Sequence, residues 1–494
     1  MGRKHENTHA TFYDQRQTRD STDESKRRKM IRWIKAKIGI PQDGQRSQHH
    51  KPSSSRSSLS QSHSSGRETS FTSAYMGNPY SHQHMSREQR THVIIVGGGI
   101  GGLCLAQGLK KNGIPFTVFE RDPTPNYRTQ GYRLRINSSG YEALKANLSP
   151  DNFEVFLRST GHFLPEFKYM DAETGGPAPA NVAFSHKTTS VSNVFSADRA
   201  MLRSLLLMDL NEYELQYGHA FKRYDMLPNG RVQVSFDNGR IVEGSVLIGA
   251  DGTTSRVRRQ YIPRAATLLD TDSGAIYGKT PITPEIEAFF STESTTLVTS
   301  HKPMMSLVME PRCSSQVNLR EYTSMATSGL PDLQEYICWV LIARAQHFHV
   351  SDDISVQDLF SMSPAEVAEL SCEMTKRWSP KVRQIFEGQA PEWCSFLRIS
   401  TMSPDLRIWQ PSSVTLIGDA VHTMTPAGIG CNTALQDARI LVKYFKEYGV
   451  GVDAIASYER RMREYGREGI NVSIAAGKQM FDLPSVEQMR AVVY

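Results

Sequence analysis

Three glycines near residue 100 have the spacing that lets a protein backbone approach a phosphate. Gly97, Gly99 and Gly102 follow a mostly β-branched, apolar run at 92–96, which predicts a buried parallel strand. The first glycine permits a tight turn, the second permits close approach of a phosphate, and the third lets the next helix pack on the strand. We expect that helix at about 103–112, with its N-terminus facing the pyrophosphate of a dinucleotide. A glycine-rich turn without a ligand is the alternative interpretation.

An acidic residue follows the next predicted strand. Residues 116–119 indicate this strand, which ends at Glu120. A carboxylate at that point can accept hydrogen bonds from ribose hydroxyls. Because it would repel a 2′-phosphate, the site favours FAD or NAD over NADP. The neighbouring Arg121 is also expected to contact the cofactor.

A second glycine-rich stretch, near the C-terminus, distinguishes between the dinucleotides. Residues 414–417 indicate a buried strand, and Asp419 follows at its carboxyl end, where open α/β sheets bind ligands. Its carboxylate can hold a hydroxyl of the ribityl chain of FAD. The loop beyond it has few side chains, so its backbone N–H groups and the next helix N-terminus can approach a flavin ring. An ordinary strand-loop-helix crossover is the alternative. The expected cofactor contacts in this loop are Pro426, Gly428, Gly430 and Asn432.

A third short motif lies between these two in the chain. Alternating apolar residues at 232–236 and 240–242 predict a hairpin around an Asp-Asn-Gly turn. The strand after the hairpin leads to Asp251 and Gly252. At a strand end, these residues can contact both a flavin and a visiting nicotinamide cofactor. Taken without its neighbours, the motif would indicate only a simple Asp-Gly turn.

Together these motifs resemble the single-component FAD-dependent aromatic hydroxylases, the class of para-hydroxybenzoate and salicylate hydroxylase. The resemblance covers about residues 91–480. Residues 249–256 are similar to the central Asp-Gly motif of that family, and residues 418–438 are similar to its second flavin motif. The resemblance also implies that Arg199, at a helix start, lies beside the flavin and that Arg133 lies along the cofactor.

The resemblance implies an α/β fold and a flavoprotein oxidoreductase. The expected fold is a Rossmann-like FAD-binding domain with an inserted β-sheet substrate domain, C-terminal helices and a disordered N-terminal tail. Non-covalent FAD is the expected cofactor and NAD(P)H the co-substrate. Molecular oxygen would serve, through a flavin C4a-hydroperoxide, to hydroxylate or epoxidise an aromatic or polycyclic small molecule. The run Tyr277-Gly-Lys-Thr-Pro281 resembles a fungal and bacterial subgroup linked to secondary metabolism.

Two other interpretations remain open at this point. A flavin-dependent dehydrogenase or reductase on the same fold would transfer no oxygen, and a binding protein would keep the fold without turnover. No Ser-His-Asp or Cys-His constellation and no metal-ligand cluster stands out, so no metal is expected and no catalytic residue is assigned. His422 is the one candidate catalytic histidine, and we expect it to hold the flavin loop in place instead.

The 494-residue chain divides into four expected regions. Residues 1–90 are rich in Ser, His, Gln, Lys and Arg, with little apolar surface to offset ordering entropy, and therefore predict a disordered tail. The FAD-binding domain is expected at 91–264 and again at 401–494, where its last part includes C-terminal helices. The segment 265–400 between them is expected to form the substrate-binding β-sheet.

Composition favours a reduced, cytoplasmic-type compartment. The six cysteines lie far apart, no secretory signal is evident, and no apolar run has the length of a membrane-spanning helix. The net charge of +6 is modest, and no nucleic-acid partner is expected. Much of the basic excess lies at 26–38, which leaves open peripheral membrane contact and nuclear or organellar targeting beside a solvated tail.

Overall fold

The computed structural model describes residues 91–125, 127, 133–162, 167–178, 194–290, 294–312, 335–348 and 359–493. The expected tail at 1–90, its basic stretch at 26–38 and residues 130–132 lie outside this described part. Within the described part, no helix combines the length and the apolar character that crossing a bilayer requires.

The first sheet contains five strands in the order β17-β11-β1-β2-β7, and every neighbouring pair is parallel. All residues of β1, β2 and β11 are buried, as expected for parallel strands covered on both faces. The expected Rossmann-like α/β arrangement is confirmed. Three distant stretches of chain supply the strands: β1 (Val93–Val96) with β2 (Phe116–Phe119), β7 (Leu215–Gln216) with β11 (Val246–Gly249), and β17 (Val414–Leu416).

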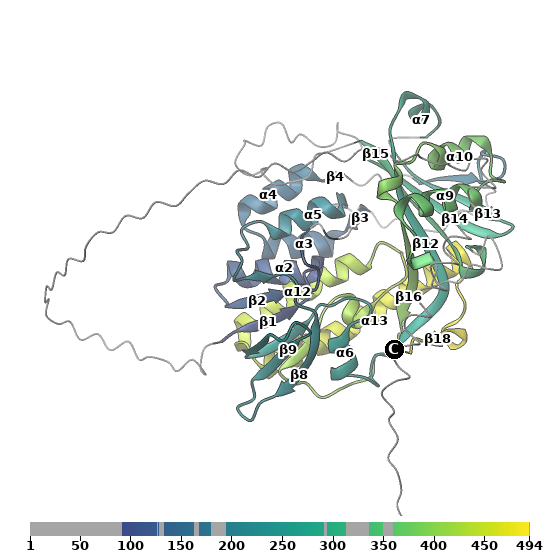
Figure 1. The fold of residues 1–494 in the computed structure, drawn as a ribbon. Coiled ribbons are helices and arrows are strands. Elements are labelled where there is room, and N and C mark those ends of the chain that lie inside the picture. Colours follow the sequence, from purple (N-terminus) through teal and green to yellow (C-terminus); the bar gives the residue numbers. More distant parts are fainter. Residues whose placement is uncertain are drawn as a thin grey trace, which may run out of the picture. The chain divides into compact units, whose positions relative to one another are not determined.

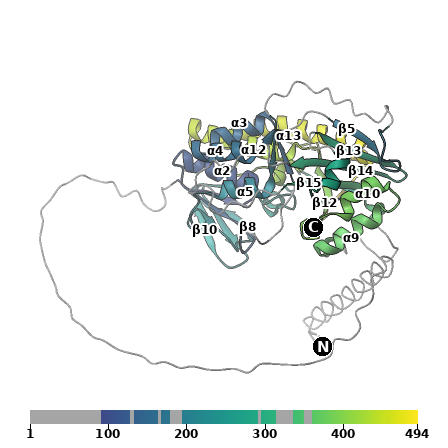
Figure 2. The same cartoon turned by 90° about the horizontal axis from the view of Figure 1, so that it is seen from above.

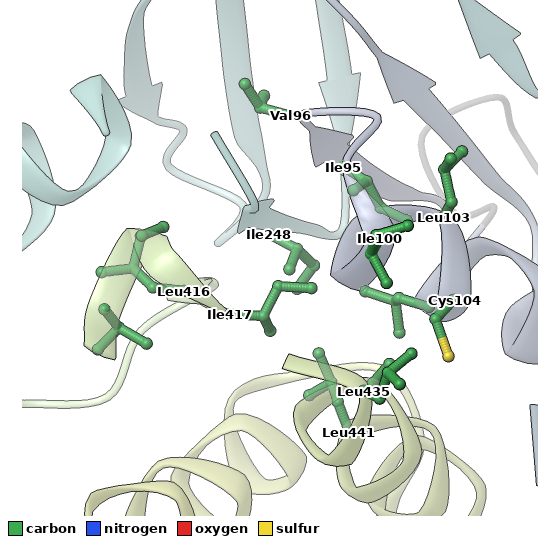
Figure 3. Packing of buried hydrophobic residues seen from close by; sticks show 14 of the residues in the cluster. Ile95, Val96, Ile100, Leu103, Cys104, Ile248, Leu416, Ile417, Leu435 and Leu441 are labelled. Atoms are coloured by element: carbon green, nitrogen blue, oxygen red, sulfur yellow. The ribbon is translucent and has the colours of Figure 1, made fainter. Parts of the chain in front are cut away.

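Two helices bring the glycine-rich stretches together. Helix α2 (Ile100–Lys111) begins directly after the β1 turn and packs against α12 (Gly430–Tyr448), which begins after the second glycine-rich loop. Figure 3 shows Leu435 of α12 and Ile248 of β11 among the buried side chains that join these helices to the sheet. Two elements more than three hundred residues apart in sequence therefore meet over the same sheet. Further helices in this region are α3 (Ser138–Asn147), α4 (Pro150–Ser159) and α5 (Arg199–Leu207).

A second, larger sheet has the strand order β16-β12-β15-β14-β13-β5, with β18 paired to β12. Most of its pairs are antiparallel, but β5 joins β13 in parallel. Strand β5 comes from before α5 in sequence, so a short early segment crosses into a sheet formed mainly by later residues. The strands are β5 (Phe167–Asp171), β12 (Leu268–Pro281), β13 (Thr295–His301), β14 (Met304–Arg312), β15 (Tyr336–Arg344), β16 (Ser395–Met402) and β18 (Arg490–Ala491).

Two three-stranded sheets complete the strands. Strand β9 (Val232–Phe236) pairs antiparallel with β8 (Phe221–Met226) and with β10 (Ile241–Gly244), which confirms the predicted hairpin. Its turn glycine, Gly239, has a φ of +85°, a conformation that favours glycine. The other sheet has the order β3-β6-β4 and includes Arg133 in its first strand. Its strands are β3 (Arg133–Ile136), β4 (Gly161–His162) and β6 (Phe195–Asp198).

The long helix α13 (Val452–Phe481) connects the two main sheets. It packs against α12 and against β17 of the first sheet, and also against β14, β15 and β16 of the larger sheet. Figures 1 and 2 show α2 to α5 gathered around the first sheet, with α9 and α10 beside the second. The remaining helices are α6 (Arg256–Tyr261), α7 (Pro284–Phe289), α9 (Pro364–Met374), α10 (Pro380–Glu387), α11 (Asp419–His422) and the 3₁₀ turns η5 (Ala345–His347), η6 (Pro391–Trp393) and η7 (Val486–Gln488).

Candidate functional site

The glycines between β1 and α2 have different structural roles. Gly97 has a φ of +113°, and a Cβ added there would lie 2.2 Å from the carbonyl oxygen of Ala250. A Cβ at Gly102 would lie 2.2 Å from the carbonyl oxygen of Gly97, so this glycine allows α2 to follow the turn closely. A Cβ at Gly99, in contrast, would have no atom within 4 Å. Gly97 and Gly102 thus shape the turn, and Gly99 faces open space.

The acidic residue at the end of β2 supports this turn. One carboxylate oxygen of Glu120 accepts the backbone N–H of Gly98 at 2.6 Å, and the other accepts the N–H of Asp122 at 2.9 Å. The side chain is buried, and it lines a cavity of about 590 Å³ together with the exposed Arg121 and the three glycines at 97–99. Each carboxylate oxygen keeps a further lone pair with which to accept a hydroxyl from a ligand in this cavity.

Asp251 has a local structural role that the sequence did not reveal. Its carboxylate accepts the Ser255 hydroxyl at 2.5 Å and the backbone N–H groups of Arg256 at 2.7 Å and Val257 at 3.2 Å. These bonds hold the first turn of α6. Burial raises the pKa of Asp251, although its hydrogen bonds oppose this shift. The adjacent Gly252, with a φ of +78°, lines the cavity with its backbone.

Asp419 lies at the start of α11, directly after the end of β17. The residue lines a second cavity of about 550 Å³ and is exposed to it. Protein atoms nevertheless surround much of the Asp419 side chain. This desolvation raises the pKa of Asp419, and the charges of His422 and Arg199 act in the opposite direction. Asp419 therefore lines the cavity, where the positive charge of Arg199 acts on its carboxylate.

The glycine-rich loop after α11 also lines this second cavity, with Pro426, Gly428 and Gly430. Gly428 has a φ of +71°, a backbone conformation that residues with a side chain rarely adopt. Asn432 holds the loop in place: its amide nitrogen donates to the carbonyl oxygens of Gly428 at 2.9 Å and of Arg135 at 2.7 Å. Its amide oxygen accepts the N–H of Asn137 at 2.9 Å. The Asn432 side chain is buried and binds protein rather than facing the cavity.

A buried polar network lies behind the Asp419 turn. Nε2 of His422 is 2.7 Å from Asp437, which also accepts the backbone N–H of Gly418 at 2.7 Å and the Tyr465 hydroxyl at 2.5 Å. Both His422 and Asp437 are fully buried. Burial acts to lower the pKa of His422, but Asp437 and then Asp419 raise it above its ordinary value. The network anchors the backbone of Gly418, so the position of His422 agrees with the expected role of holding the loop.

The two arginines suggested by the family resemblance occupy different places. Arg199, the first residue of α5, lines both cavities. Arg133 lines the second cavity only, where its guanidinium donates to the Pro311 carbonyl and the Ser196 hydroxyl. Its Nε is buried without a partner. Arg199 therefore marks the junction of the cavities, and Arg133 lies at the boundary with the larger sheet.

The two cavities adjoin, because Gly99, Arg199, Ala250, Gly252 and Leu397 line both. One end holds the β1 turn and Glu120, and the other passes the loop after Asp419 to the larger sheet. An acid at a strand end, an open glycine turn and a side-chain-poor loop are the features that the ribose, the pyrophosphate and the flavin ring of FAD would need, respectively. The residues present therefore fit FAD.

Sequence reasoning missed the residues on the sheet side of the second cavity. They come from strands distant in sequence, and most are apolar or aromatic. Strand alternation predicts that such residues share a face, but not which face meets the cofactor. These residues include Phe167, Tyr169, Tyr277, Leu297, Val308, Val340, Leu397 and, from α13, Met480.

Comparisons with known proteins find FAD-binding relatives of this chain. Residues 229–468 match a family model described as an FAD binding domain, and residues 95–154 match an NAD(P)-binding Rossmann-like domain. A dual O-methyltransferase/FAD-dependent monooxygenase of Phaeosphaeria nodorum is 31% identical over 438 residues, which are 80% of this chain and 47% of that protein. A protein of the same description from Cercospora beticola is 32% identical over 79% of this chain and 46% of its own length. The chain thus spans about half the length of these relatives.

A solved structure gives the same result at the level of the fold. A protein of Photorhabdus luminescens, named as an FAD-containing monooxygenase, has a TM-score of 0.64 and 28% sequence identity. The match covers 79% of this chain and 98% of that one. The chain therefore carries an FAD binding domain and is similar to FAD-dependent monooxygenases.

Proposed function

We propose that this protein is an FAD-dependent monooxygenase that uses NAD(P)H and molecular oxygen to hydroxylate or epoxidise an aromatic or polycyclic small molecule. The observation that carries the proposal is the second cavity. It extends from the loop after Asp419, where the flavin ring would lie, to apolar side chains of the larger sheet such as Val340 and Leu297. A flavin-dependent dehydrogenase or reductase on the same fold would transfer no oxygen to its substrate. Oxygen consumption coupled to substrate conversion therefore separates the two activities.

The cofactor would extend through both cavities. Glu120 and the β1 turn would hold the ribose and the pyrophosphate, and Asp419 would accept a hydrogen bond from the ribityl chain. Arg199 would lie at the junction, where its guanidinium can contact the pyrophosphate or the ring. Gly252 and Gly428 would let the backbone approach closely, with Gly97, Gly99, Gly102, Arg121, Arg133, Asp251, Pro426, Gly430 and Asn432 as further contacts or supports.

Bound FAD would accept a hydride from NAD(P)H and activate oxygen, which is chemistry that no side chain here supplies. The protein would contribute binding, orientation and exclusion of water. The apolar strands around Val340 would hold the substrate ring and keep water away from it. Tyr169 and Tyr277 line the same space and offer hydroxyl groups that can orient a polar substituent.

Relatives named for two activities suggest a setting for this chemistry. The monooxygenases of Phaeosphaeria nodorum and Cercospora beticola carry an O-methyltransferase activity in their names. A hydroxyl group placed on an aromatic ring is a substrate for such a methyl transfer. We infer that secondary-metabolite aromatic compounds are the substrate class to test first.

The test has two parts. Denaturing the purified protein should release FAD rather than FMN, because the binding groove fits a dinucleotide without covalent attachment. NADH or NADPH consumption should then rise with an aromatic substrate, with equimolar oxygen uptake and an oxygenated product. Substrate conversion that continues without oxygen would overturn the monooxygenase and favour a dehydrogenase.

A further inference from the structure

A buried lysine in the larger sheet forms an ion pair that the proposed function does not use. Nζ of Lys279, from β12, donates to Asp198 at 2.9 Å, and both side chains are more than nine-tenths buried. The ammonium also lies over two aromatic rings, 4.2 Å from the centroid of Tyr336 and 4.8 Å from that of Trp393. Desolvating two charges is costly, so such a pair is poor evidence for stability and better evidence for a required geometry.

Asp198 connects three elements. One carboxylate oxygen accepts the backbone N–H groups of Ala200 at 2.8 Å and Met201 at 3.1 Å and so caps the first turn of α5. The other accepts Lys279 of β12 and the hydroxyl of Tyr336 of β15. Burial acts to raise the pKa of Asp198, but Lys279, Tyr336 and the backbone lower it below its ordinary value. The carboxylate is therefore charged at neutral pH and ties α5 to the larger sheet.

The residue immediately after Asp198 is Arg199. Its side chain lines both cavities, and its charge opposes the raised pKa of Asp419. The first turn of α5 sets the backbone position of Arg199. Asp198 caps this turn, and Lys279 holds the Asp198 carboxylate in place. A movement of this turn would displace the guanidinium relative to both cavities at once.

We propose that Lys279 is a positioning residue, which acts through Asp198 to hold Arg199 at the junction of the two cavities and thereby sets the affinity for FAD. The inference rests on the proposed function, since it assumes that Arg199 contacts FAD. It gives Lys279 a role in cofactor binding, although Lys279 lies in the larger sheet and lines neither cavity.

The first test is a double-mutant cycle on the full-length protein, with the FAD dissociation constant as the readout. Arg199→Ala is expected to weaken FAD binding about tenfold or more, because it removes a charged hydrogen-bond donor. Lys279→Met is expected to weaken binding about tenfold in the wild-type background. In the Arg199→Ala background the same change should alter affinity by less than about twofold, because its effect passes through Arg199.

A paired variant separates positioning from stability. Lys279→Met alone leaves the Asp198 charge buried without its partner and is expected to lower the thermal midpoint. Adding Asp198→Asn removes that charge and keeps an oxygen that caps α5. The paired variant should therefore recover thermal stability but keep the weakened FAD binding. Lys110→Met is the matched control, because it breaks the Lys110–Glu214 ion pair at 2.7 Å away from both cavities; FAD affinity should not change.

The outcomes separate the two proposals. If the wild-type protein binds no FAD, the proposed function and this inference are both overturned. If FAD binds and Arg199→Ala weakens it while Lys279→Met does not, only the inference is wrong. Equal effects of Lys279→Met with and without Arg199, or a paired variant that recovers affinity together with stability, would also overturn it.

Discussion

At the β1 turn the wall of the candidate site is glycine backbone, whereas beneath the larger sheet the wall is formed by side chains from several strands. In the first, Gly97, Gly99 and Gly252 present backbone atoms. In the second, residues such as Tyr169 and Val340 set the shape. Backbone geometry tolerates almost no added atom, while a wall of side chains changes shape with each substitution. The cofactor half is therefore expected to be the less tolerant of mutation.

The largest expected effect is that of Gly102→Ala on stability. The added Cβ would lie 2.2 Å from the carbonyl oxygen of Gly97 and 3.2 Å from Cβ of Ala250, so backbone must move. We expect the free energy of unfolding without added FAD to fall by about 3 kcal/mol in denaturant titrations.

Gly99→Ala is the matched control for this prediction. Its added Cβ meets no atom within 4 Å, and its φ of −79° suits any residue. The free energy of unfolding should stay within about 1 kcal/mol of wild type, the cost of losing a glycine N-cap. FAD binding should weaken, because the methyl group would occupy the space of a phosphate. Equal destabilisation by the two substitutions would contradict the distinction between them.

Asp419→Ala should have the largest effect of a single side chain on the cofactor. Losing a charged acceptor for the ribityl chain should weaken FAD binding by roughly ten- to a hundred-fold. Asp419→Asn should lose less, because its amide oxygen still accepts. FAD dissociation constants measure both, and an unchanged constant for Asp419→Ala would remove this loop from the flavin site.

A substitution on the sheet side should act on the substrate alone. Val340→Phe adds a ring to the wall of the second cavity, so kcat/KM for an accepted substrate should fall about tenfold or more, while bound FAD stays stoichiometric. Val472→Phe, on the exposed face of α13, is the control and should change neither quantity. Loss of FAD from Val340→Phe would show that the two halves of the site are not separable.

The smallest expected effect concerns pH and the network behind the cofactor loop. The pKa of His422 is raised in the folded protein above its unfolded value near 6.5. Its contribution to stability is therefore fully present below pH 6.5 and is lost as pH rises through the folded pKa. His422→Gln should then cost about 1 kcal/mol more at acidic than at alkaline pH in denaturant titrations. A cost that does not vary with pH would mean that folding leaves the pKa of His422 unchanged, and a cost that is larger at alkaline pH would mean that the buried imidazole stays neutral.

Short-range patterns predicted the local structures that line the cofactor half of the candidate site. The turn at Gly97, the strand end at Glu120 and the loop after Asp419 depend on local conformations that only certain residues adopt, so they are visible in sequence. The hairpin around Gly239 and the long helix α13 were predictable for the same reason. Local patterns leave other roles open, however: Asp251 holds the first turn of α6 and Asn432 bonds three backbone groups, contacts that the motifs alone do not reveal.

By itself, the sequence determined the α/β class, the glycine turn after β1, and the positions of Glu120 and Asp419 after their strands. These features depend on residues that are neighbours in the chain. Only the tertiary structure decided which side chains face the second cavity, because β5 and β12 to β16 meet there through long-range pairing. The same holds for the Lys279–Asp198 ion pair, whose partners are 81 residues apart. No local preference specifies such a contact; it exists because two strands from separate sheets are brought together when the chain folds.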